Sequence, residues 1–493
     1  MMEWIRGHRA LAAALAMTLA FASLMVWQLF FEEEYWMVLF PAGLALLWFF
    51  LARFESVLVF IAFFTPLSLN LDVTYKLTLS VPTEPLMILF TIFFFFRVLV
   101  ARNYDIRLLR HPVTIMVTIS LLWMATTSLV SEMPVASLKH TAARLWFVIP
   151  FFYACVQFMK DPKLARKLLG AYSISLAAVI VIATLKTIGN YSDLQTVHRV
   201  MQPFYNDHTA YGCVIALFIP LTIYFISEGS RKAKWRMESS KWTIGLWVAM
   251  LVLLCIGVVF SYCRAAWLSL AGALLMYLLV RAGIKMRWVV AGIAVAAIAF
   301  FSYQGDLLYK MGKNKQDSSF TLAEQVQSIS NISTDASNLE RLNRWACAVR
   351  MWNEHKLTGC GPGTYQFLYA SYQRSYQLST ISTNAGDLGN AHSEYIGPLT
   401  EQGVPGAVIV LLLFGTTFAT GVRVYRTAKD PRVRRMALAF ALSLLTYYIH
   451  GIFNNFLDSD KLSVPFWILT AAIVALDVYG DDYSSEVSEM KRR

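Results

Sequence analysis

The stretch Asn390-Ala-His-Ser-Glu-Tyr-Ile-Gly-Pro-Leu-Thr-Glu-Gln-Gly-Val-Pro-Gly406 decides the fold, because it joins the longest polar segment of the chain to an apolar helix. The polar segment covers about residues 304–393, and the apolar residues after it continue to about residue 422. A run of that length is long enough to cross a bilayer. Long loops inside compact proteins are usually functional. We therefore expect any chemistry to lie near His392, at the entrance of the helix.

The amino-acid composition is that of a membrane protein. Hydrophobic residues make up 57% of the 493 residues and charged residues 15%, and the mean hydropathy is +0.51. Soluble domains average about 45–50% apolar and about 25% charged residues. The net charge of +12 does not call for a nucleic-acid partner, because cytoplasmic loops of membrane proteins carry excess Lys and Arg. Composition therefore predicts an all-α polytopic membrane protein that contacts membrane lipids and no nucleic acid.

Apolar runs of about 20 residues indicate membrane spans, and the chain has about 12–14 of them. The first run follows a basic N-terminus and is longer than the apolar region of a usual signal peptide, so we expect an uncleaved helix. The predicted spans are 10–31, 35–52, 56–70, 85–101, 113–130, 144–159, 168–188, 209–227, 242–260, 265–280, 288–304, 396–422, 436–453 and 462–478.

Basic clusters mark one side of the membrane. They occur in alternate loops at 6–9, 102–110, 160–167, 231–241, 281–287, 423–435 and 491–493. The other loops are Glu32–Glu34, Asp72–Pro85, Ser131–Thr141, Gly189–His208, residues 305–393 and Asn454–Lys461. By the positive-inside rule both termini are cytoplasmic, and the long loop 305–393 faces the periplasm of a bacterial inner membrane.

The long loop contains one predicted amphipathic helix. Ser337-Asn-Leu-Glu340 is a capping-box pattern, and Gly359 supplies a stop signal. Between them, Glu340 and Arg344 are spaced as an i,i+4 ion pair. Apolar residues recur at helical spacing at Leu342, Trp345, Ala346, Val349 and Trp352, which predicts a helix lying at the membrane surface. Two cysteines of the loop, Cys347 and Cys360, either pair or remain free thiols.

Two arginines in the outer loops are candidates for binding an anion. Arg264 follows Ser261-Tyr-Cys263 in a tight turn, and Arg199 precedes the eighth span. Each is either a solvated or snorkelling side chain or a bidentate ligand for phosphate or carboxylate. His208 is the first residue of the eighth span and follows Asn206-Asp207, a helix-cap pattern. It is therefore either a structural residue at the helix start or a functional one.

His392 is the candidate general base. Histidine accepts protons near neutral pH, although a lone histidine at a helix entrance is often structural. Arginines on the same side without acidic partners in sequence predict an anionic ligand there, which favours the functional reading. Glu394 and Glu401 are candidates to orient the imidazole. The sequence has no P-loop, dinucleotide loop, Ser-His-Asp spacing or metal cluster, and we predict no cofactor and no metal.

Six short motifs in order resemble the O-antigen ligase/polymerase superfamily, whose shared region is called the Wzy_C domain. The resemblance covers about residues 190–420; the first 180 residues match only as membrane helices. The motifs are Asn206-Asp-His-Thr-Ala-Tyr-Gly212, Ser261-Tyr-Cys-Arg-Ala-Ala-Trp267, Glu340-Arg-Leu-Asn-Arg-Trp345, Gly359-Cys-Gly-Pro-Gly363, Ala391-His-Ser-Glu-Tyr395 and Glu401-Gln-Gly-Val-Pro-Gly406. Cys263 departs from the commoner Ser or Thr, and His208 from a frequent Asn.

This resemblance implies a GT-C-like fold and a metal-independent, inverting glycosyltransferase. Its substrates would be a glycan on undecaprenyl pyrophosphate and a hydroxyl of lipid A–core or of another glycan. His392 would be the general base, and Arg199 and Arg264 would hold the pyrophosphate. The further substrate-binding candidates in the matching motifs are His208, Arg341, Arg344 and Glu394.

Three functions remain open at this point. An O-antigen ligase is favoured because the large loop lies late in the chain. An O-antigen or exopolysaccharide polymerase is the alternative in the same class. A polysaccharide transporter or flippase is disfavoured because no paired, Gly/Pro-broken halves are visible. We divide the chain into N-terminal helices 1–189, a ligase/polymerase-like core 190–422 and C-terminal helices with a tail 423–493.

Overall fold

The computed structural model describes most of the chain beyond residue 51. The described residues are 52–74, 77–101, 104–161, 163–189, 199–233, 239–292, 336–378, 382 and 389–490, with a few isolated positions at 20, 21, 23, 24, 27, 43, 48–50 and 295. The chain separates into two units, Met1–Leu58 and Val59–Arg493. The predicted spans 10–31, 35–52 and 288–304 lie mostly outside the described residues.

The described part of the chain is almost entirely helical, and nine of its helical segments are long and apolar enough to cross a membrane. The protein is therefore an all-α, multi-pass membrane protein, as predicted. These helices are α4 (Thr83–Ala101), α6 (Pro112–Leu129), α7 (Pro134–Val148) continuing through a π-helical turn (Ile149–Ala154) into α8 (Cys155–Phe158), α9 (Lys163–Gly189), α11 (His208–Ala233), α12 (Ser239–Phe260), α13 (Arg264–Arg281), α18 (Ile396–Thr427) and α20 (Asp460–Met490).

Two further helices correspond to predicted spans but are less apolar or shorter. The span expected at 436–453 is α19 (Pro431–His450), which packs against α11, α13, α18 and α20. The span expected at 56–70 is split into α3 (Phe54–Phe64) and a 3-10 turn (Thr65–Leu67). A short helix, α5 (Ile106–Leu109), precedes α6 and is capped by the carboxylate of Asp105, which accepts a hydrogen bond from the Arg107 N–H at 3.0 Å.

Two local predictions need correction. The sixth span does not start at residue 144 but at Pro134, because proline is favoured at the first position of a helix; most of the expected loop Ser131–Thr141 is therefore helical. The expected loop after Asp72 contains an antiparallel hairpin of β1 (Leu69–Thr74) and β2 (Leu77–Val81). Its alternating apolar and polar residues are a strand pattern that we did not interpret as one.

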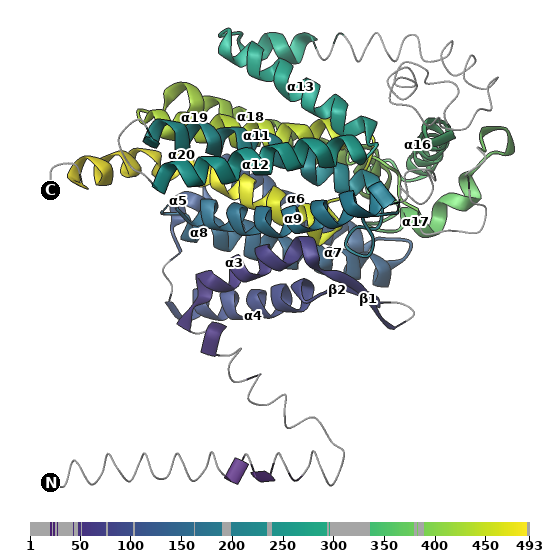
Figure 1. Ribbon diagram of the computed structural model, residues 1–493. Coiled ribbons are helices and arrows are strands. Elements are labelled where there is room, and N and C mark those ends of the chain that lie inside the picture. The colour runs from purple at the N-terminus through teal and green to yellow at the C-terminus, as the bar shows by residue number, and fades with distance from the viewer. Residues whose placement is uncertain are drawn as a thin grey trace. The chain divides into compact units, whose positions relative to one another are not determined.

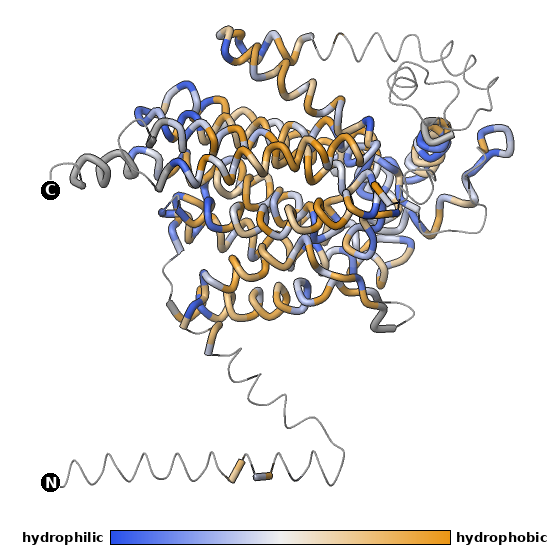
Figure 2. The backbone as a smooth tube through the Cα atoms, viewed as in Figure 1, coloured by the Kyte–Doolittle hydropathy of each residue, from blue (hydrophilic) through white to orange (hydrophobic). Residues whose placement is uncertain are grey.

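Consecutive helices run in opposite directions, so their ends form two groups. Helices α11, α13, α18 and α20 begin at one end of the bundle, and α16 (Ala336–Glu354), α17 (Tyr365–Leu368) and the hairpin lie at that same end (Figure 1). We call it the His392 end. The opposite end carries basic residues of the predicted clusters 423–435 and 160–167. Figure 2 shows hydrophobic residues along the helices and hydrophilic ones gathered toward the two ends.

Helix α20 is the central helix of the bundle. Its span is 89% buried, whereas the spans of α12 and α13 are 22% buried. At the His392 end its first turn carries a buried ionic network. The Lys461 ammonium donates to the carbonyls of Thr65 and Ser68, both at 2.7 Å, and the Asp460 carboxylate accepts from the hydroxyl of Thr83 at 2.8 Å. Buried charges persist where they are paired and hydrogen-bonded, and this network fastens α20 to the segment after α3 and to α4.

The predicted loop helix is α16, and it begins and ends close to the expected residues. The expected Glu340–Arg344 ion pair is present at 2.8 Å. However, the apolar stripe is not the face that packs on the protein: Val349, for example, is 42% exposed. The buried face is Glu340, Asn343, Arg344, Cys347, Ala348 and Met351. Three of these six residues, Glu340, Asn343 and Arg344, are polar. Their burial is tolerated because their polar groups find partners inside the protein.

Candidate functional site

His392 lies in a tight turn immediately before α18. Its backbone is left-handed, with φ of +48°, and its N–H donates to the side-chain oxygen of Asn390 at 3.0 Å. Left-handed backbone is uncommon for residues other than glycine, and strained backbone of this kind concentrates at functional sites. The turn continues into α18 through Ser393, whose hydroxyl accepts from the N–H groups of Tyr395 and Ile396, both at 3.3 Å.

Arg344 of α16 holds the segment that leads into this turn. Its Nε donates to Glu340 at 2.8 Å, its Nη1 donates to the carbonyl of Asn390 at 3.2 Å, and its guanidinium lies 4.7 Å from the ring centre of Tyr369. A Cβ on Gly389 would lie 1.9 Å from Nη1, so only glycine leaves room for this approach. Arg344, one of the predicted substrate-binding residues, is 6% exposed. It supports the His392 turn.

Arg341, one turn earlier on α16, faces the site. Its Nε donates to the carbonyl of Phe453 at 3.2 Å. Its charge acts on His392 and on Cys263, which precedes Arg264. Arg341 therefore connects two of the predicted site regions, the His392 turn and the turn before α13.

The imidazole of His392 is neutral at neutral pH. Burial, then Arg344, then Arg341 lower the pKa of His392 to about 3, while Asp207 and a hydrogen bond with Asn454 act in the opposite direction. These causes are desolvation of the charged form and repulsion between like charges. In a neutral imidazole one ring nitrogen carries no proton and can accept one.

Glu394 does not orient the imidazole of His392, contrary to the expectation from sequence. Its carboxylate accepts from the N–H groups of Phe456 at 2.9 Å and Leu457 at 3.1 Å, and from the Tyr447 hydroxyl. Burial raises the pKa of Glu394. Glu394 thus fixes the turn between α19 and α20, residues 451–459, beside His392.

That turn and the end of α19 supply two residues that sequence reasoning missed. Asn454 is 3% exposed, and its Nδ2 lies 3.1 Å from Nε2 of His450, which is 0% exposed at the end of α19. Asn454 also counteracts the lowering of the pKa of His392. The only signal in the sequence was a polar Asn-Asn pair after an apolar helix, which we interpreted as a loop.

Arg264 is the first residue of α13 and follows a turn with a left-handed residue, Tyr262, at φ of +49°. The turn packs tightly on α11. A Cβ on Gly212 would lie 2.7 Å from Cβ of Cys263 and 2.8 Å from Oγ of Ser261. The turn of the intact Ser-x-x-Arg motif therefore fixes the position of Arg264 at the start of α13. Burial raises the pKa of the Cys263 thiol to about 11.

The segment before α11 contributes Asp207. As predicted, it caps the helix: Oδ1 accepts from the N–H groups of Thr209 at 2.7 Å and Ala210 at 2.9 Å. Its charge also acts on His392 and Cys263, so it borders the site. His208 is partly buried as the first residue of α11. Arg199 lies in an exposed turn, and within the described ranges it forms no hydrogen bond or ion pair with the other predicted site residues.

The glycines of the loop at residues 359–363, after α16, hold that loop against α18. Gly359, Gly361 and Gly363 have φ of +67°, +112° and +72°. The N–H groups of Cys360 and Gly361 donate to the carbonyls of Thr400 and Glu401 at 3.0 and 2.9 Å. A Cβ on Gly359 would lie 2.3 Å from the backbone of Glu401. These close backbone contacts show that the glycines shape the loop.

Helix α18 is broken where the sequence has Gly403-Val-Pro405. Gly403 has φ of +70°, and a Cβ there would lie 2.2 Å from the carbonyl oxygen of Leu357. The Glu401 carboxylate, another predicted orienter of His392, instead accepts from the N–H of Tyr365 at 3.0 Å. Glu401 therefore anchors the start of α17. Cys347 and Cys360 are both buried free thiols, so the structure contains no disulfide between them.

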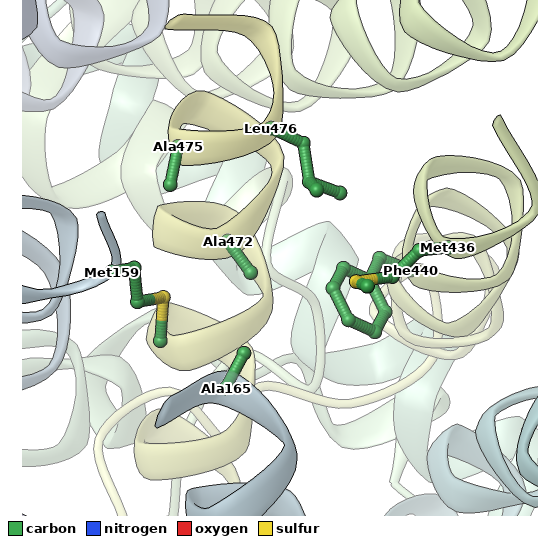
Figure 3. Close-up of a pocket in the computed structure, with 7 residues that line it drawn as sticks. All are labelled: Met159, Ala165, Met436, Phe440, Ala472, Ala475 and Leu476. Carbon is green, nitrogen blue, oxygen red and sulfur yellow. The ribbon is translucent and has the colours of Figure 1, made fainter. Parts of the chain in front are cut away.

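One hollow of the bundle lies apart from this chemistry, and a second reaches Glu394. The hollow in Figure 3 lies at the end opposite His392 and is lined by apolar side chains only: Met159, Ala165, Met436, Phe440, Ala472, Ala475 and Leu476. A groove between α6, α7 and α18 has Arg144 and Glu394 as its charged lining residues. In the part of the chain that the structure describes, no three His, Cys, Asp or Glu side chains gather as a metal site.

Comparison with known proteins identifies the region that contains this site. Residues 249–411 match the family model Wzy_C, described as O-Antigen ligase. The match includes Arg264, Arg341, Arg344 and His392, and it leaves Asn454 outside. No curated protein matches the chain. The chain therefore carries the Wzy_C domain of the O-antigen ligase superfamily, a family of glycan-transferring membrane enzymes.

Proposed function

We propose that this protein is an O-antigen ligase, which transfers a glycan from undecaprenyl pyrophosphate to a hydroxyl of lipid A–core. The observation that carries the proposal is the place of His392, in a left-handed turn that Arg344 holds and that the charge of Arg341 reaches, inside the Wzy_C domain. A base next to fixed positive charge suits a reaction in which an acceptor loses a proton and a leaving group gains negative charge.

His392 is the general base in this proposal. The acceptor hydroxyl attacks the anomeric carbon, its proton moves to the unprotonated ring nitrogen of His392, and the bond between that carbon and the pyrophosphate oxygen breaks. Undecaprenyl pyrophosphate leaves with the bonding electron pair. Attack from the side opposite the leaving group inverts the anomeric configuration. A positioned base of this kind contributes about 10²–10⁴-fold to the rate.

Arginines bind the pyrophosphate of the donor. Arg264 and Arg341 are the closest candidates, because the charge of Arg341 reaches both His392 and the residue before Arg264. Arg199 is the third, and His208 borders the same region. Guanidinium groups bind phosphate oxygens in pairs of hydrogen bonds. Because they supply the positive charge, the proposed mechanism uses no metal ion and no cofactor.

Donor binding prepares the base. In the free protein, Arg344 and Arg341 help to hold the pKa of His392 near 3. A bound pyrophosphate adds negative charge beside these guanidiniums and favours the imidazolium, so the proton affinity of His392 increases. The base therefore becomes effective when the leaving group is in place, which limits side reactions of the unoccupied site.

The decisive experiment is transfer by purified protein from an undecaprenyl-pyrophosphate-linked glycan to lipid A–core. Wild-type protein is expected to give the conjugate, and His392→Ala to lose it while folding normally. Retained transfer by His392→Ala contradicts the proposed base. A deletion strain separates the alternatives: long polymer accumulating on the lipid carrier supports the ligase, whereas single-repeat glycans support a polymerase.

The proposed orientation puts the His392 end in the periplasm and both termini in the cytoplasm of a bacterial inner membrane. Basic residues at the opposite end of the bundle support it, because Lys and Arg accumulate on the cytoplasmic side. A C-terminal reporter that is active only in the cytoplasm should be active when fused after Arg493. An inactive reporter, with a periplasmic reporter active at that site, contradicts the orientation.

A further inference from the structure

The hairpin of β1 and β2 exposes its apolar face and turns its polar face toward the protein. Side chains alternate between the two faces of a strand. By the strand register, one face carries the apolar residues Leu69, Leu71, Leu79 and Val81, which we call the leucine face. Leu69 is 38% and Leu71 is 51% exposed, whereas Ser80 on the other face is 8% exposed. An antiparallel sheet in water usually packs its apolar face on the core and leaves the polar face solvated.

The polar face is held by hydrogen bonds to neighbouring elements. The Ser80 hydroxyl donates to the amide oxygen of Asn70 at 2.9 Å, and the amide nitrogen of Asn70 donates to that of Asn206, at its side-chain oxygen, over 2.9 Å. The backbone N–H of Ser80 donates to the carboxylate of Glu84, in the first turn of α4, at 2.9 Å. These contacts fix which way the hairpin faces, so the exposure of the leucine face is a property of the fold.

The hairpin lies at the level where the lipid begins. It joins the 3-10 turn after α3 to the first residue of α4, Thr83, and Figure 1 shows it beside these two helices. Helix α4 has 19 residues. At 1.5 Å per residue it is about 28 Å long, close to the ~30 Å thickness of the hydrocarbon core. Its side chains Ile92 and Phe96 are 61% and 64% exposed, as expected of a helix that borders lipid. The leucine face therefore continues an apolar, exposed surface at the boundary of the bilayer.

We propose that the leucine face rests on lipid acyl chains at the boundary of the leaflet on the His392 end. Transfer of exposed leucine side chains from water to hydrocarbon is favourable, which accounts for a face that water would disfavour. The backbone groups at the two outer edges of a two-stranded sheet require water or headgroups as partners. The hairpin therefore stays at the interface and does not enter the hydrocarbon core. This inference does not depend on the proposed function.

The contact has a consequence for the candidate site. Asn206, which accepts from Asn70, directly precedes Asp207, the residue whose carboxylate caps α11. Asp207 borders the site because its charge acts on His392. A hairpin anchored on lipid thus holds the start of α11 at a fixed depth, at the level where the headgroups of membrane lipids lie.

The test measures the depth of single nitroxide labels on full-length protein in vesicles of phosphatidylethanolamine and phosphatidylglycerol. Cys255→Ser removes the exposed thiol, and the remaining native cysteines are buried. A label is then placed by Leu71→Cys on the leucine face, or by Thr78→Cys as the matched control. Thr78 is exposed and lies on the other face, since it pairs with Asp72 in the register.

Oxygen, which concentrates in hydrocarbon, and a neutral nickel chelate, which stays in water, report where each label lies. The ratio of oxygen to nickel collisions should be severalfold higher at Leu71→Cys than at Thr78→Cys. Equal ratios, with both labels open to the nickel chelate, overturn the proposal because the leucine face would then face water. A Leu71→Cys label shielded from both reagents and broadened by a second label also overturns it, in favour of a contact between two copies of the chain.

Asn70→Ala tests the connection to α11 separately. The Leu71→Cys label should keep its oxygen-to-nickel ratio in this variant, because the leucine face is unchanged. Amide hydrogen exchange at Thr209 and Ala210, whose N–H groups donate to Asp207, should become severalfold faster once the bond to Asn206 is lost. Unchanged exchange would show that the hairpin does not hold the start of α11, and a lost ratio would show that the leucine face is not positioned by lipid.

Discussion

Arg344 donates a hydrogen bond to the backbone carbonyl of Asn390 at 3.2 Å, although 46 residues separate the two in sequence. This contact joins the helix of the long loop to the turn that carries His392. The guanidinium also pairs with Glu340 and covers the ring of Tyr369. The helix that sequence reasoning assigned to the membrane surface therefore has a second role, which is to hold the candidate base.

Removing this arginine should disturb folding and transfer together. Arg344→Ala leaves the buried Glu340 carboxylate without the arginine of its ion pair, and breaking a buried pair costs about 3–5 kcal/mol of the free energy of unfolding. Arg344→Lys should restore little, because an ammonium lacks the planar fork that reaches two acceptors. Thermal unfolding of the purified protein measures the first effect and kcat the second. Wild-type behaviour of Arg344→Ala would show that the Asn390 contact is dispensable.

Arg264 is predicted to contribute through donor binding. Arg264→Ala should lower kcat/KM by about 10²–10³-fold, the usual effect of losing a group that stabilises developing negative charge. Arg264→Lys should lie between this variant and wild type, because it keeps the charge and loses bidentate geometry. Titration with undecaprenyl pyrophosphate measures the affinity directly. If both variants bind and react like wild type, Arg264 does not hold the pyrophosphate.

The glycines of the loop at residues 359–363 should not tolerate a side chain. Gly359→Ala puts a Cβ 2.3 Å from the backbone of Glu401 at a φ of +67°, so we expect more than about 1 kcal/mol of destabilisation. Gly397→Ala is the matched control, because a Cβ there meets nothing within 4 Å and the position is helical. That control should be neutral or stabilising by about 0.5–1 kcal/mol. The unfolding midpoints of the two variants are the measurement. A midpoint of Gly359→Ala equal to that of Gly397→Ala would show that the loop tolerates a side chain at this position.

His392 should make stability depend on pH. Its pKa is lowered from 6.5 to about 3 in the folded protein, so between these values the unfolded chain binds more protons than the folded one. Stability from this group is therefore complete above about pH 6.5 and is lost as the pH falls toward 3. His392→Gln should reduce the slope of unfolding free energy against pH in this window by up to about 1.4 kcal/mol per pH unit. An unchanged slope means that the pKa of His392 is not lowered in the folded protein.

Sequence alone determined the helices and their alternation. A bilayer demands about 20 apolar residues with internal backbone hydrogen bonds, and this demand is local, so runs such as 168–188 and 209–227 correspond closely to α9 and α11. The capping pattern before Glu340 located α16 for the same reason. The hairpin at Leu69–Val81 was missed because its alternation is short and sits among apolar helices.

The composition of the site was decided by tertiary structure. Sequence supplied His392 and the arginines as candidates, but it could not show that Arg344 contacts Asn390, or that Glu394 binds the N–H of Phe456, 62 residues away. Nor could it show that Arg341 donates to the carbonyl of Phe453, because that contact forms only when α16 packs on the turn between α19 and α20. Hydropathy is a property of each segment by itself, whereas hydrogen-bond partners depend on which segments pack together, and only the folded chain contains that information.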